Sequence, residues 1–250
     1  MTDSLRDQLA RGTPLIGTIV SLAAPEVAEL ISGVGFDWLF IDMEHAPLGA
    51  LDVQRLLQAM RPGCRSVVRV PANEEAWIKR AADLGCDGIL VPLVNSAESA
   101  ARAVRWARYP PAGSRGVGIG RAHGYGLSFE DYVQRANHDL ALIVQAEHIE
   151  AVRHIDEIVR VPGVDAVFIG PYDLSGSLNK PGQVGDPEVQ AAVERVRQVC
   201  QEAGMPLGVF GATAEAVRPF VEQGYTLVAV GMDTLYMGTA AGQTLAALKK

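Results

Sequence analysis

Two short apolar runs near the middle of the chain each lead into an acidic residue. The run Leu142–Ala146 is followed by Glu147, and Val167–Gly170 is followed closely by Asp173. Near-continuous apolar runs with polar residues at their C-terminal ends are typical of buried parallel strands. The segment between them, Ile149–Pro162, has helical spacing, so we expect the two strands to form one βαβ unit and to lie side by side. Glu147 and Asp173 would then project from neighbouring strand ends, close enough to share a divalent cation.

Other apolar runs also end in chemically useful residues, and these ends meet at one edge of a parallel sheet. The residues are Asp42, Glu44, His45, Arg69, Gln145, Pro171, Tyr172, Phe210, Met232 and Asp233. Glu147, Asp173 and Gln145 would give hard oxygen ligation with open positions, which suits Mg²⁺ or Mn²⁺, with Co²⁺ as a further candidate. Such a cation can polarise a bound carbonyl, Arg69 can stabilise a developing enolate, and His45 can carry a proton near neutral pH. The combination predicts proton abstraction or carbon–carbon cleavage next to a ketone.

Less specific explanations stay open for some of these residues. Glu147 and Asp173 could be ion-paired surface groups, and His45 could stand at the start of a helix, just before Ala46-Pro47. A mechanism through a lysine imine is not favoured, because no lysine lies at a strand end. The four lysines are Lys79, Lys180, Lys249 and Lys250.

The elements that must position these residues alternate between strand-like and helical patterns. Strands are predicted at Leu15–Leu22, Trp38–Asp42, Ser66–Val70, Gly88–Val94, Ala141–Ala146, Ala166–Ile169, Pro206–Phe210 and Leu227–Gly231. Helices are predicted at Pro25–Val34, Leu51–Met60, Glu74–Leu84, Ser96–Ala107, Ile149–Val159, Pro187–Ala203, Ala214–Gln223 and Asp233–Leu248. Eight such repeats in 250 residues predict an α/β fold, one closed (β/α)8 TIM barrel that spans residues 1–250 as a single domain. An open doubly wound sheet is the alternative, but no G-x-G-x-x-G fingerprint follows the first strand.

The composition is that of an ordinary soluble globular protein. Hydrophobic residues make up 48% and charged residues 20%, and 22 basic against 29 acidic residues leave a net charge of −7. Because no Lys/Arg cluster stands out, nucleic-acid binding is not expected. The polar start does not resemble a signal peptide, no apolar run is long enough to span a membrane, and three widely spaced cysteines are typical of reduced thiols. These features predict a cytoplasmic protein.

Longer motifs connect the candidate residues. They are Asp37-Trp38 leading to Ile41-Asp42-Met43-Glu44-His45-Ala46-Pro47, then Val68-Arg69-Val70, Tyr109-Pro110-Pro111-Ala112-Gly113-Ser114-Arg115-Gly116, Gln145-Ala146-Glu147, and Phe168-Ile169-Gly170-Pro171-Tyr172-Asp173-Leu174-Ser175. With these motifs in this order, the chain resembles the metal-dependent (class II) pyruvate aldolases of the HpcH/HpaI aldolase family from Gly17 to about Gly238. The resemblance implies a barrel of the phosphoenolpyruvate/pyruvate-like type. It also implies cleavage of 4-hydroxy-2-oxo acids to pyruvate, or hydroxypyruvate, and an aldehyde, together with the reverse aldol addition.

The resemblance further implies roles for single residues. Glu147 and Asp173 would hold the divalent ion, and Arg69 would contact the keto oxygen and stabilise the enolate. His45 would act with Asp42 as the acid/base group. The other residues that bind the keto acid would be Gln145, Gly170, Pro171 and Tyr172. The family also implies a homohexamer of dimers that exchange their last helix.

The acceptor half of the substrate is less well defined by the resemblance, because the loop Gly118–Gly126 departs from the family pattern. This loop belongs to the glycine-rich segment Tyr109–Ser128, which is expected to cross the barrel surface and, at this length, to be either functional or disordered. Arg121 and His123 are expected to bind substrate over the mouth of their own or a neighbouring subunit. Phe210 is expected to select the aldehyde by shape, and its alternative role is core packing.

Two rival functions remain at this point. One is a CoA-ester or oxaloacetate-type lyase or decarboxylase that uses the same enolate chemistry, although few basic residues lie near the predicted mouth. The other is a barrel that binds metal and keto acid without turnover. His45 and Arg69 count against the second rival, because binding alone does not require an acid/base pair.

Overall fold

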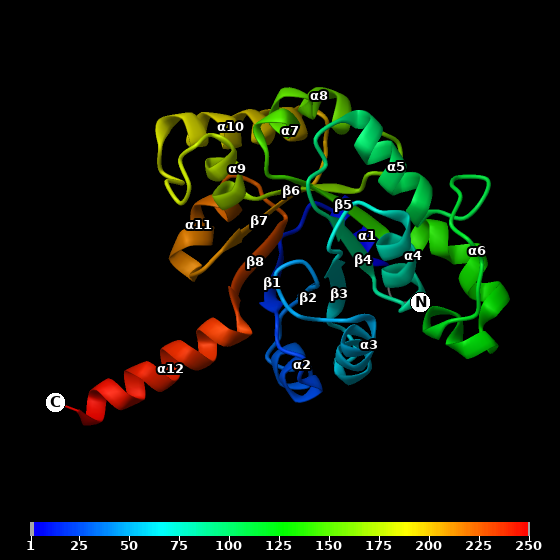
Figure 1. The fold of residues 1–250 in the computed structure, drawn as a ribbon, viewed down its shortest axis with the longest axis horizontal. Coiled ribbons are helices and arrows are strands. Elements are labelled where there is room, and N and C mark those ends of the chain that lie inside the picture. The colour runs from blue at the N-terminus through cyan, green and yellow to red at the C-terminus, as the bar shows by residue number, and fades with distance from the viewer. Residues whose placement is uncertain (1–2, 250) are drawn as a thin grey trace.

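Eight parallel strands close into a barrel in chain order, with β1 paired to both β2 and β8 (Figure 1). The structure, a computed structural model, describes residues 3–249. The strands are β1 (Leu15–Val20), β2 (Trp38–Asp42), β3 (Arg65–Arg69), β4 (Gly88–Val91), β5 (Ala141–Ala146), β6 (Ala166–Ile169), β7 (Leu207–Gly211) and β8 (Leu227–Met232). The predicted (β/α)8 barrel is thereby confirmed, and the open doubly wound alternative is wrong.

Most of the helices surround this barrel, and the last one extends away from it (Figure 1). The helices are α1 (Leu5–Ala10), α2 (Pro25–Ser32), α3 (Ala50–Ala59), α4 (Glu75–Asp83), α5 (Ala97–Ala107), the 3-10 helix η1 (Arg121–Gly126), α6 (Phe129–Asp139), α7 (Ile149–Arg153), α8 (Ile155–Ile158), α9 (Pro171–Ser177), α10 (Pro187–Glu202), α11 (Ala214–Glu222) and α12 (Asp233–Leu248). Within residues 3–249, no helix is both long and apolar enough to cross a lipid bilayer.

The helix predicted over Ile149–Val159 is divided into α7 and α8 at His154. The backbone of His154 leaves helical geometry (φ −104°, ψ 12°), and its imidazole Nδ1 lies 2.9 Å from the carbonyl oxygen of Glu150. The helix α6 was not predicted at all. Its apolar residues, from Phe129 to Ala136, recur at the i, i+3, i+4 and i+7 spacing of a helix face, so the sequence contains a signal that could have identified it.

Large and small side chains fit together on the strands of the barrel. The indole of Trp38 lies over Gly17, where a Cβ atom would come within 2.5 Å of the ring. The ring of Phe168 lies over Gly208 in the same way, with a Cβ distance of 2.3 Å. A single buried cluster contains both rings and Leu9 of α1. The interior of the barrel is therefore filled with side chains, so a functional site is expected at one of its ends.

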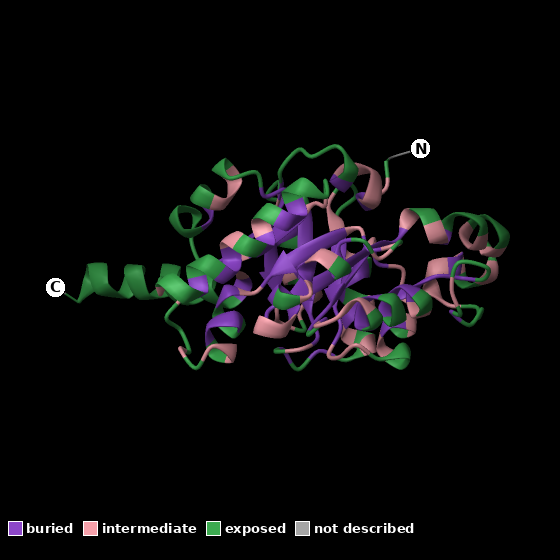
Figure 2. Cartoon of the chain, turned by 90° about the horizontal axis from the view of Figure 1, so that it is seen from above, coloured by how far each residue is buried: buried purple, intermediate pink, exposed green. Residues whose placement is uncertain are grey.

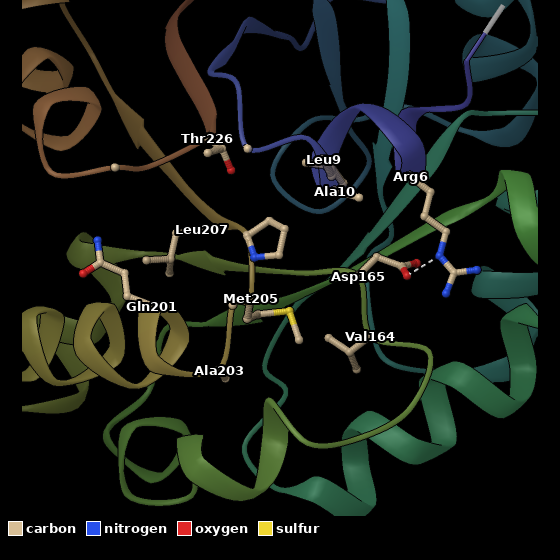
Figure 3. Close-up of a pocket in the computed structure, with 14 residues that line it drawn as sticks. Arg6, Leu9, Ala10, Val164, Asp165, Gln201, Ala203, Met205, Leu207 and Thr226 are labelled. Carbon is tan, nitrogen blue, oxygen red and sulfur yellow. Dashed lines mark hydrogen bonds and ion pairs between the residues drawn. The ribbon is translucent and has the colours of Figure 1, made fainter.

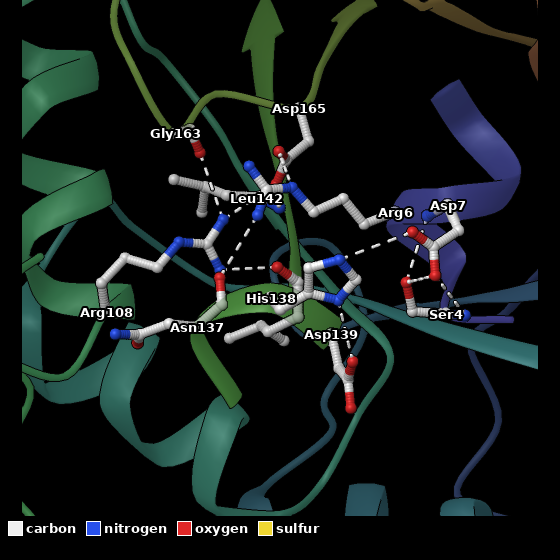
Figure 4. A network of polar contacts seen from close by, with 11 residues as sticks. Ser4, Arg6, Asp7, Arg108, Asn137, His138, Asp139, Leu142, Gly163 and Asp165 are labelled. Carbon is white, nitrogen blue, oxygen red and sulfur yellow. Dashed lines mark hydrogen bonds and ion pairs between the residues drawn. The ribbon is translucent and has the colours of Figure 1, made fainter. Parts of the chain in front are cut away.

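The amino end of the barrel is closed by a buried polar network (Figure 4). The carboxylate of Asp165, just before β6, accepts hydrogen bonds from Arg6 Nε (2.6 Å), Arg108 Nη2 (2.8 Å) and the backbone N–H of Leu142 (2.8 Å). Arg108 Nη1 also donates to the carbonyl of Leu140 at 2.6 Å. A hollow of about 570 Å³ lies at the same end (Figure 3), and its charged residues Arg6 and Asp165 neutralise each other. The ion pairs and hydrogen bonds at this end of the barrel therefore stabilise the fold.

The last helix, α12, leaves the barrel and extends away from it (Figure 1), and Figure 2 shows it exposed along its length. Its first residue, Asp233, is buried and holds the helix to the end of β1. The Asp233 carboxylate accepts hydrogen bonds from the backbone N–H groups of Ser21 (2.8 Å) and Leu22 (2.9 Å) and from the Ser21 hydroxyl (2.7 Å). The root of α12 is thus fixed, and the Tyr236 hydroxyl adds a hydrogen bond to the carbonyl of Val230 (2.7 Å), whereas the helix residues after Asp233 are exposed.

Candidate active site

The carboxyl ends of the strands surround a pocket of about 280 Å³. Nine of the residues proposed from the sequence line it, namely Asp42, His45, Arg69, Gln145, Gly170, Pro171, Tyr172, Asp173 and Phe210. The lining is completed by the apolar side chains of Ile19, Phe40, Phe168, Ile169 and Met232. The structure therefore brings most of the candidate residues to one mouth.

Arg69 and Asp42 form a buried ion pair at the ends of the neighbouring strands β3 and β2. Arg69 Nε donates to Asp42 Oδ1 at 2.9 Å and Nη2 donates to Oδ2 at 2.8 Å, which is a two-pronged contact. Burial alone would raise the pKa of Asp42, but the hydrogen bonds and positive charge of Arg69 hold it below its usual value. The third guanidinium nitrogen, Nη1, is not used by Asp42 and makes no hydrogen bond within residues 3–249.

Glu147 is buried next to the end of β5 and is held from two sides. Its Oε1 accepts the backbone N–H of Leu93 at 2.7 Å, and its Oε2 accepts a hydrogen bond from the amide of Gln145. Burial raises the pKa of Glu147 to about 7, and the negative charges of Glu44 and Asp173 add to this effect. A buried carboxylate with other acids nearby is a group that a cation would stabilise.

Gly170 allows Glu147 and Gln145 to approach the start of α9. A Cβ atom at this position would lie 2.9 Å from the Cβ of Glu147 and 3.1 Å from Nε2 of Gln145. Asp173 lies in the first turn of α9, where the leading backbone N–H groups have no intrahelical acceptor. The N–H of Gly170 donates to the carbonyl of Ala146, and proline has no N–H. The amides of residues 172 and 173 are therefore the ones available to an anion.

His45 lies at the rim of the pocket, and its side chain is 61% exposed. The alternative that it begins a helix is wrong, because α3 starts at Ala50. Its contact with Asp42 is made by the backbone N–H of His45 (3.3 Å), whereas the imidazole Nε2 lies 3.7 Å from Oε2 of Glu44.

The oxygen-rich donor set fits a divalent cation. Within residues 3–249, no three His, Cys, Asp or Glu side chains form a ready metal cluster. Glu147 and Asp173 are nevertheless close enough to influence each other's charge, and Oε1 of Gln145 is buried without a hydrogen-bond partner in the described part of the chain. Two carboxylates and an amide oxygen would leave the other positions to substrate and water, as Mg²⁺ or Mn²⁺ sites commonly do.

Arg121 is not at the mouth, so the expectation that it binds substrate there is wrong for this chain's own pocket. Its guanidinium donates to the carbonyls of Leu84 (2.7 Å), Gly85 (3.4 Å) and Leu57 (3.4 Å). These carbonyls belong to α3 and to the end of α4, so they lie away from the carboxyl ends of the strands. Arg121 satisfies carbonyls that have lost their helical partners, which explains why the loop turns this way.

His123 does not lie at this chain's mouth either, although the sequence predicted that it binds substrate there. The residue is fully buried, its Nε2 lies 3.0 Å from the hydroxyl of Tyr109, and its ring stacks on Phe129 and meets Tyr132 edge-on. Burial lowers the pKa of His123, and the charge of Arg115 lowers it further. A ring enclosed in this way serves the packing of its own loop and does not line this chain's pocket.

Two contributors were not identified as such from the sequence. The N–H of Leu93 is a backbone group, presented by a left-handed conformation (φ 52°) that no motif announces. Glu44 was noted at a strand end, but its position between Arg69 and His45 depends on the path of the chain after β2. Residue types alone do not reveal such contacts.

Comparison with known proteins shows that the chain is similar to one family of enzymes. The chain matches the family described as HpcH/HpaI aldolase/citrate lyase over residues 15–239. It is 41% identical over 243 residues to the 2-dehydro-3,6-dideoxy-6-sulfogluconate aldolase of Pseudomonas putida, covering 96% of this chain and 95% of that protein. It is 42% identical over 244 residues to the 4-hydroxy-2-oxo-heptane-1,7-dioate aldolase of Shigella flexneri, covering 96% and 91%. The crystal structure of an HpcH/HpaI aldolase/citrate lyase family protein from Burkholderia cenocepacia J2315 matches with a TM-score of 0.95 and 38% identity over 100% of both chains.

Proposed function

Because the chain belongs to the HpcH/HpaI aldolase/citrate lyase family, we propose that it is a divalent-metal-dependent aldolase. The proposed reaction is cleavage of a 4-hydroxy-2-oxo acid to pyruvate, or hydroxypyruvate, and an aldehyde, with aldol addition as the reverse. The observation that carries the proposal is the forked Arg69–Asp42 pair, in the same pocket as Asp173 and Gln145. Within residues 3–249 this pair leaves Nη1 of Arg69 without a hydrogen-bond partner.

The chain's own groups can perform each proton and charge movement of this reaction. In cleavage, a base takes the proton of the C4 hydroxyl, the C3–C4 bond breaks, and the aldehyde leaves. The bonding electrons remain on the pyruvate fragment as an enolate, which then takes a proton at C3. We assign the proton movement to His45 and the stabilisation of the enolate oxygen to Nη1 of Arg69, since both residues line the pocket. The first amides of α9 suit the carboxylate of the keto acid.

The metal would be held by Glu147 and Asp173, beside the amide of Gln145. When bound, a divalent cation supplies Lewis-acid polarisation of the keto group. We propose Mg²⁺ or Mn²⁺, with Co²⁺ as a further candidate, because carboxylate and amide oxygens are ligands that these ions accept.

The pocket favours an aldolase over the two rivals. A CoA ester needs a wide, basic channel, but this pocket measures about 280 Å³ and its arginine is paired with Asp42. A sensor that only binds a keto acid has no need of His45 at the rim.

A direct assay tests the proposed function. The protein is incubated with Mg²⁺ or Mn²⁺, pyruvate or hydroxypyruvate, and a panel of aldehydes. The aldol product is measured in these samples and in samples from which the metal has been removed by a chelator. Borohydride added with pyruvate should leave activity intact, because no lysine imine forms. A trapped pyruvyl adduct, or no aldol product with any donor and aldehyde, would contradict the proposal.

Phe210 is expected to select the aldehyde. Its ring lines the pocket and also packs against the apolar interior of the barrel, so both roles considered for it are sterically available. Phe210→Ala and Phe210→Trp should shift the ranking of aldehydes in opposite directions by size, with pyruvate methyl-proton exchange preserved. The control is Phe220→Ala, which removes a ring that packs on Tyr225. Equal loss of stability in all three variants, with unchanged aldehyde ranking, would assign Phe210 to the core.

We further propose that α12 is exchanged between two copies of the chain within a homohexamer. No charged residue lies between Asp233 and Lys249, and the apolar side chains of Leu245 (51% exposed) and Leu248 (81% exposed) have no cover within residues 3–249. Beside the root of the helix, an apolar groove is lined by Leu30 and Val34 of the α2 region.

Leu245→Asp is expected to dissociate the assembly toward smaller species, because a charge would be placed in the buried contact. The matched control is Gln243→Asp on the same exposed helix. Light scattering after size exclusion measures the mass of each. If Leu245→Asp keeps the mass of the unsubstituted protein, helix exchange is not the basis of the assembly.

A cytoplasmic location is proposed as well. Cys64, Cys86 and Cys200 are all free, and burial raises the pKa of each thiol to about 12. Such thiols suit a reducing compartment and take no part in the chemistry.

A further inference from the structure

The carboxylate of Glu44 is the one charged group at the mouth to which neither the reaction nor the metal assigns a task. Its Oε2 atom is buried and has no hydrogen-bond partner within residues 3–249. The atom lies 3.3 Å from Nε of Arg69 and 3.7 Å from Nε2 of His45. A buried acceptor without a donor is energetically unfavourable, so a partner for this atom is favoured.

Arg69 is not that partner. Its Nε–H already donates to Oδ1 of Asp42 at 2.9 Å, and this hydrogen cannot serve Glu44 at full strength as well. The imidazole of His45 remains. Because its side chain is 61% exposed, it is free to turn, and a small rotation shortens 3.7 Å to hydrogen-bond length.

Asp42, the residue expected to act with His45, makes no contact with the imidazole within residues 3–249. Its Oδ1 receives the backbone N–H groups of Glu44 (3.0 Å) and His45 (3.3 Å) as well as Arg69 Nε. Its Oδ2 receives Nη2 of Arg69 at 2.8 Å. The carboxylate is thus committed to the guanidinium and to the turn after β2.

We propose that Glu44, rather than Asp42, is the positioning residue for His45: its Oε2 accepts the Nε2–H of the imidazole and leaves Nδ1 unprotonated as the nitrogen that moves the proton. The proposal rests on the aldolase function proposed above and specifies its acid/base group. When Nδ1 takes a proton, the ring becomes a cation and the Glu44 carboxylate stabilises it. Asp42 then has a separate task, which is to hold the guanidinium of Arg69.

The electrostatic setting of Glu44 agrees with a cationic partner. Burial raises the pKa of Glu44, while the charges of Arg69 and His45 act to lower it. A carboxylate in this position gains most when a positive charge appears beside it, as happens once His45 is protonated.

The test measures exchange of the pyruvate methyl protons into heavy water, which isolates proton transfer from aldehyde binding. Glu44→Leu should slow this exchange about 10- to 100-fold, the range known for residues that orient an active group. Glu44→Gln keeps an acceptor and should recover much of that loss. Nitrogen-15 NMR of the imidazole should report the Nε2–H tautomer in the unsubstituted protein and a mixture of tautomers in Glu44→Leu. Mn²⁺ affinity should be unchanged in both variants.

The decisive step combines the substitutions. If Glu44 acts through His45, Glu44→Leu should cause no further loss in a His45→Ala background. The same fold-loss in both backgrounds would overturn the proposal, because Glu44 would then act by another route, and so would unchanged exchange in Glu44→Leu. If His45→Ala itself leaves exchange unaffected, it is the proposed acid/base role of His45 that fails, and the two failures are told apart.

Discussion

Glu147→Ala is expected to abolish tight binding of the divalent cation and to reduce aldol cleavage to background. Glu147 and Asp173 supply the anionic charge of the proposed metal site, and changes one shell further out already cost about 10- to 100-fold in affinity. Asp173→Ala should have the same effect. The measurements are Mn²⁺ titration and initial rates after chelation and metal restoration.

A surface carboxylate provides the control for this loss. Glu150 lies three residues beyond Glu147, but its side chain is 41% exposed and paired with Arg153. Glu150→Ala should therefore bind Mn²⁺ and turn over normally. Full activity in Glu147→Ala after exhaustive chelation would show that the metal assignment is wrong.

Arg69→Lys is expected to lower turnover by roughly a hundredfold, which corresponds to about 3 kcal/mol of transition-state stabilisation. Lysine keeps the charge but cannot hold both oxygens of Asp42 and still direct a third nitrogen at the enolate. Turnover is measured at saturating substrate and metal, alongside the melting temperature. Near-normal turnover in Arg69→Lys would remove the proposed role.

The buried ion pair makes Arg69→Ala a less informative variant than lysine. Removing the guanidinium leaves Asp42 buried without its partner, which typically destabilises a protein by about 3–5 kcal/mol. Loss of activity in Arg69→Ala thus combines a catalytic and a folding effect. A melting temperature close to that of the unsubstituted protein is what qualifies Arg69→Lys as a test of chemistry.

The strands and their ends could be predicted because parallel barrel strands are nearly continuous apolar runs. Trp38–Asp42, Ala141–Ala146 and Ala166–Ile169 have the bounds that these runs indicated. Since every strand of a barrel ends at the same face, the convergence of Arg69 and Gln145 on one pocket followed from strand order alone.

Contacts between side chains could not be predicted in the same way. The sequence pattern indicates that Asp42 and Glu44 lie near one strand end. It does not indicate that Asp42 pairs with Arg69 or that Glu44 faces His45. The glycine-rich segment has no periodicity at all. Where Arg121 lies was decided by carbonyls at the ends of two helices far away in the sequence, which no local pattern reveals.

Because α12 extends away from the barrel, its stability and that of the barrel should depend differently on protein concentration. A lone helix of 16 residues is marginal in water, and the internal glycines Gly238 and Gly242 weaken it further. The barrel gains its stability from contacts within one chain, so dilution leaves it folded. If α12 is exchanged between copies as proposed, its order beyond the contacts of Asp233 and Tyr236 depends on binding a second copy, and its helicity should decrease on dilution before the barrel unfolds.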